Sequence, residues 1–128
     1  MRIGGVVEKI LVIEDEEAQL KLLLNILHDA GFKAVGAKDG LEAREIYRRE
    51  QGEFDLVLSD MALPKLGGWT VYLMLKEINP NLKMILTSGY LDAKVKDDLV
   101  RGGVKDFIPK PYLPETIVAS VKHALDNA

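Results

Sequence analysis

The chain has 128 residues, of which 48% are hydrophobic and 29% are charged, and its formal net charge is −3. This length fits one globular domain with a buried core, and the slightly acidic balance argues against the basic surface that direct binding of DNA or RNA requires. The absence of cysteine excludes disulfides, thiol nucleophiles and cysteine-based zinc sites, and it fits a reducing cytoplasm. The most apolar run, Leu20 to Leu27, is too short to span a bilayer, so we expect no membrane insertion.

The first predicted strand, Lys9–Ile13, is apolar almost without alternation, which is typical of a central strand buried on both faces. A helix follows it and ends at Gly31. Its leucines have the spacing of one buried helical face: Leu20, Leu23, Leu24 and Leu27. The second strand, Lys33–Ala37, is weaker and is expected at the edge of a sheet.

The second helix is predicted to begin at Asp39, because Glu42 three residues later completes a capping-box pair. Its buried face comprises Ala43, Ile46 and Tyr47. A third strand, Asp55–Ser59, has the composition of a central strand. The third helix is expected from Gly68 to Ile78, before Asn79 and Pro80.

The fourth strand, Lys83–Thr87, is again expected at the centre of the sheet. A short, weakly amphipathic helix follows over Asp92–Val100, and Gly102 and Gly103 end it. The fifth strand is Lys105–Ile108. The last helix opens near Pro114, and its predicted buried face comprises Ile117, Val118, Val121 and Leu125.

Strands and helices therefore alternate along the whole chain. This pattern predicts an α/β fold of the (βα)₅ type, in which a doubly wound, five-stranded parallel sheet has helices on both faces. We expect the strand order 2-1-3-4-5, with residues 9–128 forming one domain and residues 1–8 an extension or linker.

Acidic residues follow the two strands between which this strand order reverses, where such sheets bind ligands. Glu14 and Asp15 follow the first strand, and Asp60 follows the third. Three carboxylates this close repel one another, and a hard divalent cation such as Mg²⁺ would relieve that repulsion. Because the cation also screens an approaching anionic phosphoryl group, Asp60 is suited to attack phosphorus and form an aspartyl phosphate.

The last two strands end in groups that suit a phosphoryl group. Ser88 offers a hydroxyl after the fourth strand, and Gly89 leaves its backbone N–H accessible. Lys110 offers a point positive charge after the fifth strand. A nucleophile with cationic neutralisation of the phosphoryl oxygens is what phosphoryl transfer requires.

Together, Glu14-Asp15, Asp60, Ser88, Phe107 and Lys110-Pro111 resemble the receiver domain of two-component response regulators. The resemblance covers Lys9 to Ala128 and includes the loop motif Asp60-x-x-x-Pro64-x-x-Gly67-Gly68. It implies a flavodoxin-like receiver fold and a cis peptide bond between Lys110 and Pro111.

The resemblance also implies the roles of the site residues. Mg²⁺, or Mn²⁺ in its place, would bind Glu14, Asp15, Asp60 and the backbone carbonyl of Ala62. Asp60 would be the phosphoacceptor, with Ser88 and Lys110 binding the phosphoryl group. Ser88 and Phe107 would form the switch: Ser88 moves towards the phosphoryl oxygens, and the Phe107 ring fills the space that it leaves.

The implied function is that of a cytoplasmic signalling receiver and not of an enzyme with a separate substrate. Its phosphodonor would be a histidine kinase or a phosphotransfer protein, and an unidentified output partner would contact the fourth helix, fifth strand and fifth helix. A homodimer that forms on phosphorylation is also compatible with this class. Ala62 and Tyr90 occupy positions that tune the lifetime of the phosphoryl group in such domains, so we expect an unusual lifetime without assigning its direction.

Other functions are less compatible with the residues. A phosphatase or mutase with an aspartyl nucleophile usually has a second acid two positions later, where this chain has Ala62. A nucleotide binder needs a glycine-rich or hydroxyl-rich loop after the first strand, where this chain has four consecutive acids, residues 14–17. A degenerate receiver acting by protein contacts alone, and a receiver fragment of a hybrid sensor kinase, remain open alternatives.

Overall fold

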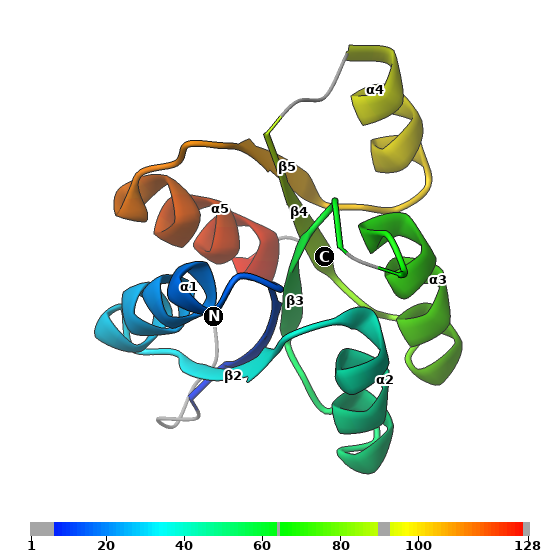
Figure 1. Cartoon of the computed structure of the whole chain (residues 1–128), viewed down its shortest axis with the longest axis horizontal. Coiled ribbons are helices and arrows are strands. Elements are labelled where there is room, and N and C mark those ends of the chain that lie inside the picture. The colour runs from blue at the N-terminus through cyan, green and yellow to red at the C-terminus, as the bar shows by residue number, and fades with distance from the viewer. Residues whose placement is uncertain (1–6, 64, 90–92, 127–128) are drawn as a thin grey trace.

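The computed structural model describes residues 7–63, 65–89 and 93–126. Within these residues, five parallel strands form one sheet in the order β2-β1-β3-β4-β5 (Figure 1). The strands are β1 (Lys9–Ile13), β2 (Lys33–Ala37), β3 (Leu56–Asp60), β4 (Met84–Ser88) and β5 (Asp106–Pro109). The helices are α1 (Glu17–Asp29), α2 (Gly40–Arg49), α3 (Gly68–Ile78), α4 (Ala93–Arg101) and α5 (Pro114–Asp126). The predicted fold class and strand order are confirmed.

The bounds of three strands differ from the prediction by one residue. The predicted ranges Asp55–Ser59, Lys83–Thr87 and Lys105–Ile108 each begin and end one position too early. Strand pairing extends further towards the carboxyl edge, where Asp60 pairs with Thr87 and Ser88 pairs with Pro109. Asp60 and Ser88 therefore belong to the sheet, and its hydrogen bonds fix their backbones.

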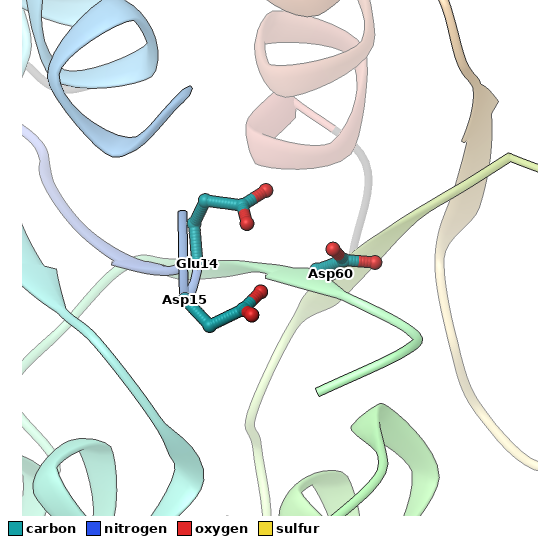
Figure 2. A group of neighbouring side chains, drawn as sticks. All are labelled: Glu14, Asp15 and Asp60. Carbon is teal, nitrogen blue, oxygen red and sulfur yellow. The ribbon is translucent and has the colours of Figure 1, made fainter. Parts of the chain in front are cut away.

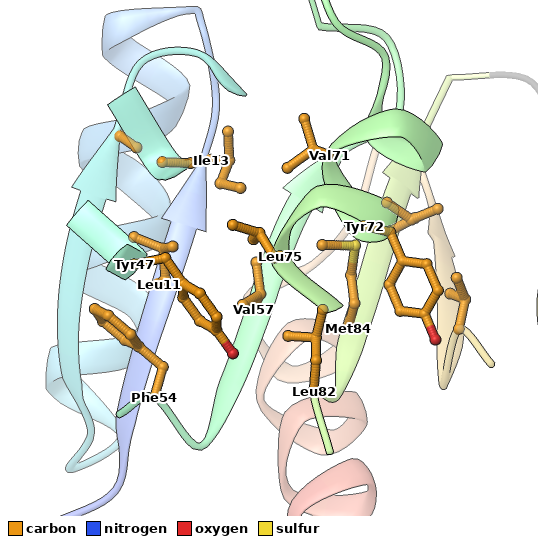
Figure 3. Packing of buried hydrophobic residues seen from close by; sticks show 14 of the residues in the cluster. Leu11, Ile13, Tyr47, Phe54, Val57, Val71, Tyr72, Leu75, Leu82 and Met84 are labelled. Carbon is orange, nitrogen blue, oxygen red and sulfur yellow. The ribbon is translucent and has the colours of Figure 1, made fainter. Parts of the chain in front are cut away.

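The helices cover both faces of the sheet, because successive strand residues point to opposite sides. α1 and α5 lie over one face and α2 and α3 over the other (Figure 1). Ile10, Val12 and Leu58 face the α1–α5 side, whereas Leu11, Ile13 and Val57 face the α2–α3 side. Figure 3 shows part of this second cluster, in which the rings of Tyr47 and Tyr72 pack beside the strands.

Most of the predicted helix faces are buried. In α1, Leu23 and Leu27 are buried, whereas Leu20 and Leu24 are partly buried against the same cluster. In α2, all three predicted residues are buried. In α5, Ile117 and Val121 are buried, and Val118 and Leu125 are partly buried. Ala124 is also buried, although it was not predicted to be.

Asp39 caps the second helix, as its pairing with Glu42 predicts, and its carboxylate accepts a hydrogen bond from the Glu42 N–H at 2.8 Å. The Glu42 carboxylate accepts from the N–H of Lys38, at 2.9 Å, and not from that of Asp39. The pair therefore caps two backbone donors at the helix start, one of them a residue earlier than in a standard capping box.

α4 is the least buried helix of the described structure. It begins at Ala93, and Asp92, with which the predicted helix began, lies outside the described residues. Leu99 is its one buried side chain, whereas Val95 and Val100 are 37% and 45% exposed. Residues 93–98 are all exposed.

The carboxyl end of α4 packs against α3 through two glycines. A Cβ at Gly102 would lie 2.5 Å from the Trp69 ring, and one at Gly103, whose φ is +112°, would overlap the Tyr72 hydroxyl. The Trp69 and Tyr72 rings stack on each other at 5.2 Å, and the Tyr72 hydroxyl donates to the Gly102 carbonyl at 3.3 Å. Glycine is required here because the α3 rings occupy the space that a side chain would need.

Over residues 7–63, 65–89 and 93–126, no helix is both long enough and apolar enough to cross a membrane.

Candidate functional site

Three carboxylates meet where the strand order reverses between β1 and β3. Glu14 and Asp15 directly follow β1, and Asp60 is the last residue of β3. Each can offer one oxygen so that the three atoms lie within 4.8 Å of one another. Figure 2 shows the carboxylates of Glu14 and Asp15 on the side of their chain segment that faces Asp60. The predicted convergence of these acids is confirmed.

Glu14 is buried, with only 2% of its surface exposed. Its Oε2 accepts a hydrogen bond from the Glu16 N–H at 3.1 Å, but its Oε1 has no hydrogen-bond partner among the described residues. Burial, followed by the nearby charge of Asp60, raises the pKa of Glu14. A buried carboxylate oxygen without a donor, beside two other acids, fits the donor set of a hard divalent cation.

Lys110 supplies the positive charge of the site. Its Nζ lies 2.8 Å from Oδ2 of Asp60 and 3.7 Å from Oε1 of Glu14. Burial alone would lower the pKa of Lys110, but the hydrogen bond to Asp60 and the two carboxylate charges raise it overall. The Lys110–Pro111 peptide bond is cis, as predicted.

Asp60 is 7% exposed, and both of its carboxylate oxygens have partners. Oδ1 accepts from the backbone N–H of Ala62 at 3.0 Å, and Oδ2 accepts from Lys110. These two bonds orient the carboxylate at the end of β3. Ala62 thus contacts the site through its N–H, and its carbonyl as a metal ligand stays a prediction.

Ser88 and Phe107 lie at the same end of the sheet. Ser88 ends β4 and is half-buried, and its carbonyl accepts from the Lys110 N–H at 2.8 Å. Phe107 is 7% exposed and packs in the α2–α3 side of the core. The hydroxyl-bearing neighbour of Ser88, Thr87, is buried in the sheet. Pro64 of the loop motif and Tyr90 lie outside the described residues.

The sequence did not indicate that Tyr112 and Gln19 would be joined by a hydrogen bond. The Tyr112 hydroxyl donates to Oε1 of Gln19 at 3.2 Å, across 93 residues of chain. Burial, and then the negative charge of Glu14, raises the pKa of Tyr112. The available signal was the aromatic residue two positions after Lys110, which gave no hint of its partner in α1.

Known proteins resemble this chain over nearly its full length. Residues 10–122 match the family described as the response regulator receiver domain. The chain is 32% identical to the sensor kinase CckA of Brucella abortus, where 92% of the chain aligns with 12% of the kinase. It is 29% identical to the chemotaxis protein CheY of Thermotoga maritima, with 89% of the chain and 94% of that protein aligned.

Solved structures of receiver domain proteins also resemble this chain. A response regulator receiver domain protein from Clostridium thermocellum superposes with a TM-score of 0.87 at 26% identity, covering 94% of this chain and 95% of that one. A chain of the CheX–CheY–BeF₃–Mg²⁺ complex from Borrelia burgdorferi superposes with a TM-score of 0.85 at 27% identity, covering 91% and 87%. With its fold, its acidic cluster and these matches taken together, the chain belongs to the response regulator receiver domain family of two-component signalling.

Proposed function

We propose that Asp60 accepts a phosphoryl group from a histidine kinase or phosphotransfer protein, and that this modification changes the surface that a partner reads. The observation that carries the proposal is the contact of Asp60 with Lys110, whose Nζ lies 2.8 Å from a carboxylate that also borders Glu14 and Asp15. An acid held between a cation and two further acids has the parts of a phosphoacceptor.

We propose Mg²⁺, or Mn²⁺ in its place, as the ion of this site. Glu14, Asp15 and Asp60 would hold it, with the Ala62 carbonyl as a further ligand. Oxygen ligands, among them a buried Glu14 oxygen that accepts no hydrogen bond from the described residues, suit such hard cations. When bound, the ion would screen the negative charge between the carboxylates and the phosphoryl group.

Asp60 would be the nucleophile of the phosphoryl transfer. Its carboxylate oxygen would form the new bond to phosphorus while the bond from phosphorus to the histidine nitrogen of the donor breaks, and the imidazole leaves with the electron pair. The Ala62 N–H orients the nucleophile through Oδ1. Lys110 and the Ser88 hydroxyl would then bind phosphoryl oxygens.

The response would begin at Ser88. Movement of this hydroxyl towards the phosphoryl group leaves a space that the Phe107 ring is placed to fill, because voids in a packed region cost energy. α4 would respond most, since it buries only Leu99. The surface of α4, β5 and α5 is thus the proposed readout surface, for an output partner or a second phosphorylated copy, in the cytoplasm.

The mass of the intact protein tests this proposal. Incubation with Mg²⁺ and acetyl phosphate should add one phosphoryl group to the wild type and none to Asp60→Asn. Asp29→Asn, which changes an exposed aspartate at the end of α1, should gain the same mass as the wild type. An unmodified wild type would instead support a degenerate receiver that acts by contacts alone.

A further inference from the structure

The hydrogen bond between Tyr112 and Gln19 joins the two segments that carry opposite charges into the site. Gln19 lies in the first turn of α1, which starts two residues after Asp15. Tyr112 follows Lys110 by two residues. We infer that Tyr112 and Gln19 are positioning residues, whose hydrogen bond holds Lys110 where its ammonium group meets the phosphoryl group on Asp60. This inference rests on the proposed function.

A cavity beside this hydrogen bond limits the packing that could otherwise support the Lys110 segment. About 360 Å³ of space lies between α1 and the segment after β5. It is lined by Glu16, Gln19, Leu22, Lys110, Pro111 and Tyr112. Because this space separates the two walls, side-chain packing supports the Lys110 segment weakly on the α1 side. The Tyr112 ring reaches across, packs partly against the α1–α5 cluster and donates to Gln19 at 3.2 Å.

On its other side, Lys110 is held by the sheet. Its backbone N–H donates to the Ser88 carbonyl at 2.8 Å, which fixes one end of the segment to β4. The side chain then extends towards Asp60 and Glu14. The hydrogen bond of Tyr112 supplies the second point of attachment, so its loss would let the ammonium group sample more positions.

The backbones of the acidic residues do not depend on this attachment. The Glu14 N–H donates to the Ala37 carbonyl at 3.0 Å, which fixes the end of β1 to β2. Asp60 is fixed by its pairing with Thr87. Breaking the Tyr112 hydrogen bond should therefore weaken phosphoryl binding without weakening binding of the cation alone, and a general loss of structure would not produce this difference.

The first experiment compares Tyr112→Phe and Gln19→Leu with the wild type. Each should bind BeF₃⁻ in saturating Mg²⁺ about two- to tenfold more weakly, the effect of one hydrogen bond, with no loss of Mg²⁺ affinity when BeF₃⁻ is absent. Tyr47→Phe is the matched control, because its buried hydroxyl bonds to Asn79 in a different part of the fold. It should leave both affinities unchanged.

The double variant should be no weaker than either single one, because both changes break the same bond. Gln19→Glu, which keeps an acceptor for the phenol, should retain most of the wild-type affinity. A loss in Tyr112→Phe that Gln19→Leu does not share would overturn the inference, since the phenol would then act on the ligand directly. Equal affinities in all variants would overturn it as well.

A second readout is independent of phosphorylation. Acetic anhydride modifies neutral lysine side chains, so Lys110 held by two carboxylates should react slowly compared with Lys21, whose side chain is 72% exposed. Tyr112→Phe and Gln19→Leu should raise the relative rate at Lys110 by about two- to tenfold, as measured by peptide mass. An unchanged ratio contradicts the positioning role, whereas a wild type without phosphoryl uptake contradicts only the proposed function.

Discussion

The ammonium group of Lys110 lies 2.8 Å from Oδ2 of Asp60 and 3.7 Å from Oε1 of Glu14. A cation of the protein itself thus neutralises part of the acidic cluster. The same ammonium group is the proposed ligand of phosphoryl oxygens, so it would exchange a carboxylate partner for a phosphoryl partner when Asp60 is modified.

Replacing Lys110 with Met should separate cation binding from phosphoryl transfer. Mg²⁺ affinity should rise, because the ion no longer competes with the ammonium group for Asp60. The rate of phosphorylation by acetyl phosphate should fall on the order of 100-fold, since one stabilising charge is lost. Calorimetry and intact mass measure the two effects. The control Lys21→Met should change neither, and a joint fall in both would contradict this division of roles.

The stability of the cation-free protein should decrease as pH rises through the range in which Glu14 ionises. Burial raises the pKa of Glu14 in the folded state, so the folded protein binds more protons than the unfolded chain between pH 4.5 and that raised pKa. The free energy of unfolding therefore falls with increasing pH across that window. Urea titrations in EDTA at several pH values should reveal the decrease.

Glu14→Gln removes this ionisable group. In EDTA at neutral pH it should be more stable than the wild type, and the decrease assigned to Glu14 should disappear. Its Mg²⁺ affinity should drop, on the order of 10- to 100-fold. A variant that keeps the wild-type pH profile would show that another group is responsible for it.

Alanine at Gly103 should destabilise the fold by about 2 kcal/mol, through the positive φ and the overlap with Tyr72. Gly67→Ala is the matched control, because φ there is −68° and its added Cβ has only an ordinary contact at 3.6 Å. Urea unfolding followed by circular dichroism compares the two. Equal losses of stability would mean that the ring contact has no particular cost.

Hydrogen exchange should distinguish the two ends of α4. Residues 93–98 are exposed, whereas Leu99 is buried and Gly102 packs against Trp69. We expect low protection over 93–98 in the free protein, a change there on addition of BeF₃⁻ and Mg²⁺, and little change after Leu99. A uniform change along the helix would contradict a fixed carboxyl end.

Much of the fold followed from local pattern. The bounds of β1, β2 and α3 were predicted to the residue, because apolar composition and helix-ending residues are local signals. The ends of β3 and β4 were not, since Asp60 and Ser88 are polar residues that the ladder keeps in the sheet.

The site was predictable where it depends on topology. Parallel strands bring their carboxyl ends to one edge, so Glu14, Asp15, Asp60 and Lys110 had to approach one another. The hydrogen bond of Tyr112 with Gln19, and the fit of Gly102 against Trp69, join residues far apart in sequence. Such pairs depend on side-chain packing in three dimensions and leave no local pattern.

The contact of Trp69 with Gly102 has an optical consequence. Trp69 is the only tryptophan in the sequence, and its indole borders the carboxyl end of α4. Indole emission responds to its surroundings, so the native protein contains its own fluorophore beside the proposed readout helix. Rapid mixing with BeF₃⁻ and Mg²⁺ could therefore show in real time whether the carboxyl end of α4 keeps its place against α3, without a dye attached to the surface that a partner would contact.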